Sequence, residues 1–79
     1  MKTPRNISAT KLIKALKSFG YEISRQTGSH IRLTTDLNGK HHITIPNHNP
    51  VKIGTFSAII TDVAQHVGKT KHEILEELF

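Results

Sequence analysis

The sequence predicts a single α+β domain, with a helix, a three-stranded antiparallel sheet, a second helix and a short C-terminal helix. Three observations support this fold class. Apolar residues recur at helical spacing near both ends of the chain, they alternate with polar residues in residues 21–45, and turn-forming residues separate these segments. A chain of 79 residues without cysteine has room for one small core and no disulfides, so we expect one domain over residues 1–79.

The first helix is expected over residues 9–19, where four apolar side chains share one helical face: Leu12, Ile13, Leu16 and Phe19. Ser8 can cap its first turn, and Ile7 can pack on this face as a hydrophobic staple. Gly20 supplies a left-handed residue that ends the helix. The outer face carries a stripe of three lysines, which is explained equally well by solvation and by phosphate contact: Lys11, Lys14 and Lys17.

Three short strands are expected next, because apolar residues alternate with polar ones at three places: Tyr21 and Ile23, Ile31 and Leu33, and Ile43 and Ile45. Residues 27–28 predict the first turn, and residues 37–39 fit a three-residue hairpin loop with Gly39 in the left-handed position. This loop places Leu33 opposite Ile43, so apolar residues pair with apolar residues, which supports an antiparallel meander.

The remainder of the chain predicts a loop and two helices. Residues 46–50 hold two prolines and two asparagines, which favour a loop. The second helix is expected between Thr55 as its N-cap and Gly68 as its end, with six apolar residues on one face: Phe56, Ile59, Ile60, Val63, Ala64 and Val67. Thr70 and Glu73 form a capping box for the last helix. Both long helices then cover one sheet face and leave the other open to solvent.

Charge is concentrated in the first half of the chain. The protein has 11 Lys and Arg residues against 6 Asp and Glu residues, with a net charge of +5, and eight of the basic residues precede His41. Such a distribution favours a polyanionic partner, most often nucleic acid, although solubilising charge is the alternative explanation. No apolar run reaches the length of a membrane span, and residues 1–5 do not begin a signal peptide. We therefore expect a soluble, cytoplasmic protein without a membrane partner.

The open face of the expected sheet carries, by alternation, side chains that suit RNA binding or cleavage: His30, Arg32, Thr34, Lys40, His42 and Thr44. We expect this face to be free of carboxylates. A neutral imidazole can accept a proton from a ribose 2′-OH, while cations hold the phosphate. His30 lies opposite Pro46, four residues along the strands from His42, so these imidazoles should not act as an acid–base pair. Arg32 and His48 are the expected helpers of His30.

Metal chemistry is not expected. His41 and His42 are adjacent in a strand and point to opposite faces, so together they cannot hold one ion. The chain has no cysteine nucleophile and no Gly-rich phosphate loop. We predict no metal site and no cofactor.

Five motifs follow one another along nearly the whole chain: Leu12-Ile13-Lys14-Ala15-Leu16, Gly20-Tyr21-Glu22-Ile23, Arg25-Gln26-Thr27-Gly28-Ser29-His30, Ile43-Thr44-Ile45-Pro46 with His48, and Ile53-Gly54-Thr55-Phe56 with Ile59 and Ile60. In this order they resemble the HicA toxins of prokaryotic toxin–antitoxin pairs, with Tyr21 where Phe is commoner and Phe56 where Leu is commoner. The resemblance implies a fold similar to a double-stranded-RNA-binding domain, metal-independent mRNA cleavage and neutralisation by a HicB antitoxin. The family's catalytic histidine, in its Gly-Ser-His motif, falls on His30.

The expected function is therefore that of an mRNA endoribonuclease toxin with His30 as general base. Five further residues are expected to contact the RNA: Ser29, Arg25, Arg32, Lys40 and His48. The expected partners are mRNA and a HicB-like antitoxin, with no DNA contact by this chain alone. Two alternatives use the same surface. One is a basic RNA-binding module without catalysis, and the other is a protein-binding partner whose positive face docks an acidic chain.

Overall fold

The order of helices and strands confirms the predicted α+β fold. The computed structural model describes residues 6–79, and expectations about residues 1–5, including the basic residues Lys2 and Arg5, lie outside this range. The chain forms, in order, α1 (Ala9–Leu16) with a 3₁₀ turn (Lys17–Phe19), β1 (Glu22–Thr27), β2 (His30–Thr35), β3 (His41–Pro46), α2 (Ile53–Val67) and α3 (Lys71–Leu78).

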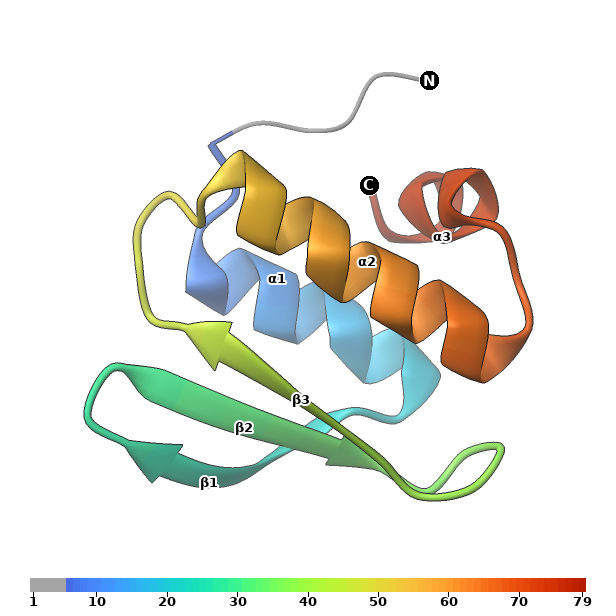
Figure 1. The fold of residues 1–79 in the computed structure, drawn as a ribbon, viewed down its shortest axis with the longest axis horizontal. Helices are drawn as coiled ribbons and strands as arrows, with labels where there is room; N and C mark the ends of the chain where they lie inside the picture. The colour runs from blue at the N-terminus through green and yellow to red at the C-terminus, as the bar shows by residue number, and fades with distance from the viewer. Residues whose placement is uncertain (1–5) are drawn as a thin grey trace.

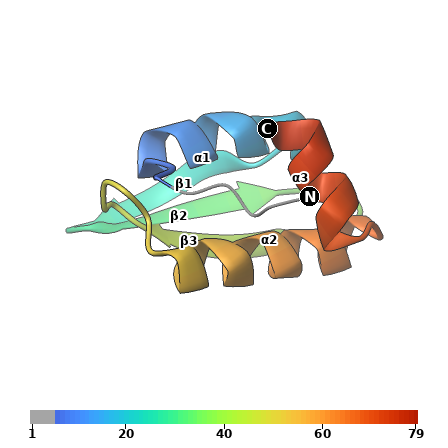
Figure 2. The same cartoon turned by 90° about the horizontal axis from the view of Figure 1, so that it is seen from above.

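The helices form one layer over one face of the sheet (Figure 1). Seen from above, α1 lies on the β1 side of the sheet, α2 lies on the β3 side, and α3 lies at one end of the helix layer (Figure 2). The core fills the space between the layers and includes the largest fully buried side chains: Tyr21, Phe56, Leu12, Leu16, Leu33, Ile45 and Ile60. Within residues 6–79, no helix combines the length and the apolar character needed to span a membrane.

Local signals at the ends of α1 and α3 act as expected. The Ser8 side chain accepts a hydrogen bond from the backbone N–H of Lys11 at 3.1 Å, and Ile7 is buried in the core beside α1. Gly20 follows the 3₁₀ turn with a φ of 80°, the left-handed conformation that ends the helical segment. Thr70 and Glu73 form both hydrogen bonds of the predicted capping box.

The pairing of β2 with β3 confirms the predicted register. Leu33 lies opposite Ile43, Ile31 opposite Ile45, and His30 opposite Pro46. Gly39 has a φ of 92°, the left-handed conformation predicted for it, and Asn38 also has a positive φ. The strands end at Thr35 and resume at His41, so the loop covers residues 36–40 instead of the expected 37–39. Pro46 is the last residue of β3, not the first residue of the following loop as expected. This edge strand tolerates a proline there because its outer side has no strand partner within residues 6–79.

The first strand differs from the prediction. Tyr21 is fully buried but precedes β1, and Ile23, which we expected in the core, is 53% exposed. The physical reason is the position of β1 at the edge of the sheet, with all six of its residues exposed. Thr27 pairs with His30, so the first turn consists of residues 28–29 instead of the expected 27–28.

The start of α2 also differs from the prediction. The helix begins at Ile53, and its N-cap position is Lys52, three residues before the expected cap Thr55, without a side-chain hydrogen bond. Thr55 is therefore a first-turn residue. Val51 is buried, and its N–H donates to the carbonyl of Ile7 at 2.8 Å. This contact fixes the chain just before the helix, so a tertiary contact takes the place of the expected side-chain cap.

Candidate functional site

A shallow hollow on the open face of the sheet gathers several of the predicted site residues. It has a volume of about 200 Å³ and is lined by Arg25, Thr27, His30, Arg32 and Thr44. Two rows of the sheet build it, because Arg25, Arg32 and Thr44 lie side by side across the three strands and Thr27 lies beside His30 in the next row. We call it the His30 hollow.

An irregularity in β1 brings Arg25 into the His30 hollow. Ile23 pairs with Leu33, which faces the core, but the register shifts before Arg25, which pairs with Arg32 on the open face. The extra residue, Ser24, donates a hydrogen bond to the carbonyl of Arg32 at 3.3 Å. Regular alternation from Ile23 would place Arg25 on the core side. The bulge is thus the reason that Arg25 and Thr27 reach the hollow.

The electrostatics of the His30 hollow favour an anion. Arg25 and Arg32 are directly opposed, and like charges in that position repel each other unless a negative group lies between them. No carboxylate lines the hollow. Within residues 6–79, the hydrogen bonds and ion pairs of histidine rings involve His41, His42, His66 and His72. The exposed imidazole of His30 is therefore available to a ligand.

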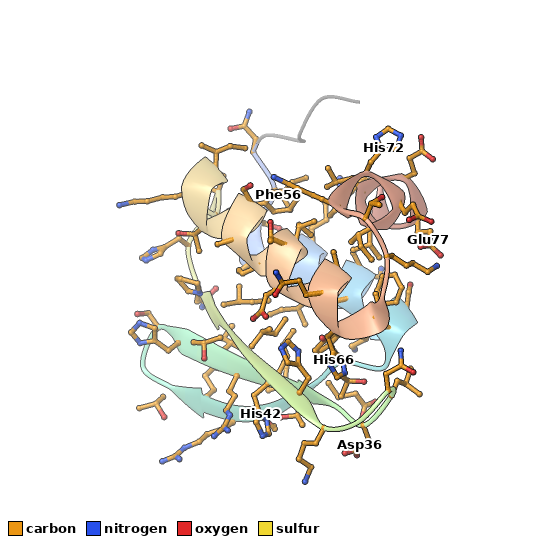
Figure 3. All side chains as sticks on the ribbon, turned by 45° about the vertical axis from the view of Figure 1, so that its right-hand side comes forward. Asp36, His42, Phe56, His66, His72 and Glu77 are labelled. Atoms are coloured by element: carbon orange, nitrogen blue, oxygen red, sulfur yellow. The ribbon has the colours of Figure 1, made fainter. Side chains whose placement is uncertain are left out.

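His42 is the second imidazole on the open face and lies outside the His30 hollow. It sits on the side of the sheet away from the helices (Figure 3). Its Nδ1 lies 2.8 Å from the hydroxyl of Thr34, which donates to the hydroxyl of Ser24 at 2.7 Å. The Thr34 oxygen therefore accepts from Nδ1–H. Desolvation, followed by the positive charges of Arg32 and Lys40, lowers the pKa of His42. The neutral ring keeps its Nε2 free as an acceptor.

Three of the predicted RNA-binding residues do not line the His30 hollow. Ser29 lies in the loop between β1 and β2, where its carbonyl accepts from the N–H of Asn47 at 2.6 Å. His48 follows β3, and its N–H donates to the carbonyl of Pro46 at 2.8 Å. Lys40 lies at the other end of the face, where its positive charge helps to lower the pKa of His42. Thr27 lines the hollow but was not among the predicted site residues, because the sequence placed it in the turn.

The expectation of a carboxylate-free face is wrong at one end of the sheet. Glu22 pairs with Thr34, so the register places it on the open face, in the same row as His42 but two strands away. The bulge is not involved, because Glu22 precedes it and alternation from Ile23 already places Glu22 on this face; the expectation considered the second and third strands only. The negative charge of Asp36 also reaches His42, where it partly offsets the lowering of the His42 pKa. Negative charge is therefore confined to the end of the face farther from His30.

His41 points to the opposite face from His42, as predicted, and takes part in a partly buried polar cluster. Its Nδ1 lies 2.7 Å from the hydroxyl of Tyr21, and its Nε2 lies 3.3 Å from a carboxylate oxygen of Asp62. The ring of His66 extends from α2 towards the strands (Figure 3) and stacks on His41 with centroids 4.4 Å apart. Burial, followed by the charge of Asp62, raises the pKa of Tyr21 to about 12. This cluster joins α2 to the sheet.

Residues 6–79 contain no group of three or more His, Cys, Asp or Glu side chains arranged to hold a metal ion.

A family model described as the HicA toxin of bacterial toxin–antitoxin systems matches residues 9–65, which include the entire sheet and the His30 hollow. No curated protein and no solved structure matches the chain.

Proposed function

This chain belongs to the HicA toxin family of bacterial toxin–antitoxin systems, and on that premise we propose that it is a metal-independent mRNA endoribonuclease inhibited by a HicB-like antitoxin. The observation that carries this proposal is an exposed imidazole in one hollow with two opposed arginines and no carboxylate. An imidazole beside two fixed cations suits the cleavage of RNA through its own 2′-OH.

In the proposed reaction, His30 accepts the proton of a ribose 2′-OH. The 2′ oxygen then attacks the adjacent phosphorus, and the bond from phosphorus to the 5′ oxygen of the next nucleotide breaks. The products are a 2′,3′-cyclic phosphate and a 5′-hydroxyl end, with the leaving oxygen taking up a proton. Arg25 and Arg32 flank the phosphate and stabilise the negative charge that develops on its oxygens.

The absence of aromatic side chains from the His30 hollow indicates how the RNA is held. The hollow is lined by arginine, threonine and histidine, so phosphate and sugar contacts dominate over base stacking. The hydroxyls of Thr27 and Thr44 flank the arginines and can donate to phosphate oxygens or accept from the ribose. Ser29, Lys40 and His48 lie outside the hollow, where we propose that they contact neighbouring nucleotides.

Replacing His30 by Ala tests the catalytic role. Because His30 is exposed, the variant should keep its fold and melting temperature but lose RNA cleavage and growth arrest. The matched control is His72→Ala, which removes an exposed histidine of α3. His72 pairs with Glu76 and does not line the His30 hollow. The control should cleave RNA at the wild-type rate. Wild-type cleavage by a folded His30→Ala protein would contradict the assignment.

The chemistry has its own test. Cleavage should continue in EDTA and leave cyclic phosphate and 5′-hydroxyl ends, which mass spectrometry of a short RNA product distinguishes from 5′-phosphate ends. Activity that disappears in EDTA and returns with Mg²⁺ would contradict the metal-independent mechanism. RNA binding without any product in the wild-type protein would favour the non-catalytic RNA-binding module.

A further inference from the structure

A groove between α1 and β1 combines apolar and basic side chains. It has a volume of about 410 Å³, and Ile13, Ile23 and Ile31 contribute its apolar surface. Lys14 and Lys17 extend from α1 along the same groove. Ile23 is 53% exposed there, a large apolar side chain that the fold itself does not cover. We call this feature the α1–β1 groove.

The groove runs beside a free sheet edge. The strand order is β1-β2-β3, so the outer backbone groups of β1 have no strand partner within residues 6–79. All six residues of β1 are exposed, and none is proline. The other edge differs, because β3 ends in Pro46 and is flanked by a groove that contains Asp62. A free edge without proline is suited to pair with a strand from another chain.

We propose that the antitoxin docks an extended, acidic segment on the free edge of β1 as a fourth strand. This inference rests on the proposed toxin function, because it names how the inhibitor of that function binds. The bulge before Arg25 leaves Arg25–Thr27 as the regular stretch with which the added strand pairs. Alternate side chains of the added strand point to opposite faces of the sheet.

The alternation determines the chemistry of the segment. On the helix side, its side chains meet Ile23 and the ammonium groups of Lys14 and Lys17, so they are apolar with carboxylates nearby. On the open side, its side chains meet Arg25 and require carboxylates. Neither the groove nor the His30 hollow is lined by a carboxylate of this chain. Within residues 6–79, none of the ion pairs involves these basic residues.

Two other occupants fit this edge less well. A second copy of the chain would bring a second Arg25 and a second set of α1 lysines to a surface that is already positive, which costs association free energy. RNA offers phosphates to the lysines, but it supplies neither backbone groups for the edge of β1 nor apolar side chains for Ile13 and Ile23. An acidic protein strand satisfies all of these groups together.

Docking at this edge would also explain inhibition. Arg25 belongs both to the edge strand and to the His30 hollow, so a strand paired with Arg25–Thr27 lies along one side of the hollow. Its carboxylates would pair with Arg25 and so compete with the RNA phosphate for this arginine. The apolar contact in the α1–β1 groove would supply the affinity that exposed charges alone do not provide.

The test measures, by calorimetry at fixed salt, the binding of a purified HicB-like antitoxin. Ile23→Glu places a carboxylate in the groove and should raise the Kd at least tenfold. Ile53→Glu is the matched control, because Ile53 is 48% exposed at the start of α2, away from the groove. Its Kd should stay within about twofold of the wild-type value. Lys14→Glu with Lys17→Glu should slow association, most strongly at low salt.

Hydrogen exchange on the complex gives a second readout. The amides of β1 should become protected when the antitoxin binds. An unchanged Kd for Ile23→Glu, or protection confined to β3 and α2, would overturn the proposal. So would a dimer of this chain that Ile23→Glu dissociates, or RNA binding that the uncharged change Ile23→Ser weakens. These readouts do not depend on RNA cleavage. If the ribonuclease proposal alone failed, the wild-type protein would not cleave RNA but would still bind the antitoxin at the edge of β1.

Discussion

At the residue scale, the imidazoles of His30 and His42 on the open face differ in their hydrogen bonds. His42 is bound to Thr34 through Nδ1 and lies near Arg32 and Lys40, which lower its pKa after desolvation. His30 makes no such contact within residues 6–79 and lies in a hollow with two arginines. A general base must reach the proton it removes, so His30, beside the two arginines proposed to hold the phosphate, is the better placed of the two.

Tyr21 allows a clean pH experiment because it is the only tyrosine in a chain without tryptophan. Its pKa is raised to about 12 by burial and then by Asp62, so the tyrosinate absorbance near 295 nm should appear with a midpoint near 12. In the urea-unfolded chain the midpoint should lie near 10. Between these values the unfolded chain releases a proton that the folded chain keeps, so stability should fall as the pH rises through this range.

The control for this titration is Asp62→Asn. Removing the carboxylate charge should lower the midpoint of Tyr21 slightly but leave it above 10, because burial is the larger cause of the shift. A folded wild-type protein that titrates near 10 would mean that the Tyr21 hydroxyl is not buried.

Single residues also show where sequence reasoning succeeds. His30 and Arg32 could be placed on the open face because the apolar residues of β2 alternate without interruption. Arg25 and Thr27 could not, because the bulge at Ser24 reverses the alternation within β1. Bulges depend on pairing with a second strand, and no residue pattern within residues 22–27 marks this one.

At the scale of the elements, helix starts were predictable where a side chain caps them. Ser8 and Thr70 accept hydrogen bonds from the first turns of α1 and α3, and both starts were predicted. Lys52 makes no such bond, and α2 begins where Val51 is anchored to Ile7, far away in the sequence. The exposed position of Ile23 has the same kind of origin, because the edge position of its strand is a property of the sheet.

The junction between α1 and β1 depends on Gly20. A Cβ atom at this position would lie 2.8 Å from both Leu37 and the hydroxyl of Thr35, and the φ of 80° is unfavourable for other residues. Thr35 is buried, and its hydroxyl donates to the carbonyl of Phe19 at 2.9 Å. Gly20→Ala should therefore lower the free energy of unfolding by about 2–4 kcal/mol, through backbone strain and the displaced hydrogen bond.

Gly68 provides the matched comparison, because it ends α2 with a φ of 72° and has open space around it. Gly68→Ala should cost only the backbone strain, about 1–2 kcal/mol. Urea unfolding of both variants separates strain from contact. Equal losses would show that the close approach to Thr35 and Leu37 has no energetic effect.

At the scale of the whole molecule, the net charge of +5 and the opposed arginines predict salt-dependent RNA binding. Each phosphate that a cation neutralises contributes about −0.7 to the slope of log affinity against log salt for single strands. Arg25→Ala and Arg32→Ala should each flatten the slope by about this amount. Lys69→Ala is the control, because Lys69 is already paired with Glu77 at 2.7 Å and should leave the slope unchanged. Salt-independent binding would indicate base stacking outside the His30 hollow.

The arrangement of the whole molecule also predicts that RNA and antitoxin exclude one another. Both are expected to place negative groups against Arg25, which the bulge has moved into the His30 hollow. With the His30→Ala protein, which is expected not to cleave RNA, the apparent Kd for a fluorescent RNA should rise in proportion to the antitoxin concentration, and fluorescence anisotropy measures this rise. Direct competition of this kind requires no change in fold, because RNA and antitoxin would bind the same positive charges. A ternary complex that binds RNA with unchanged affinity would place the antitoxin away from the open face, and inhibition would then have to act through another part of the molecule.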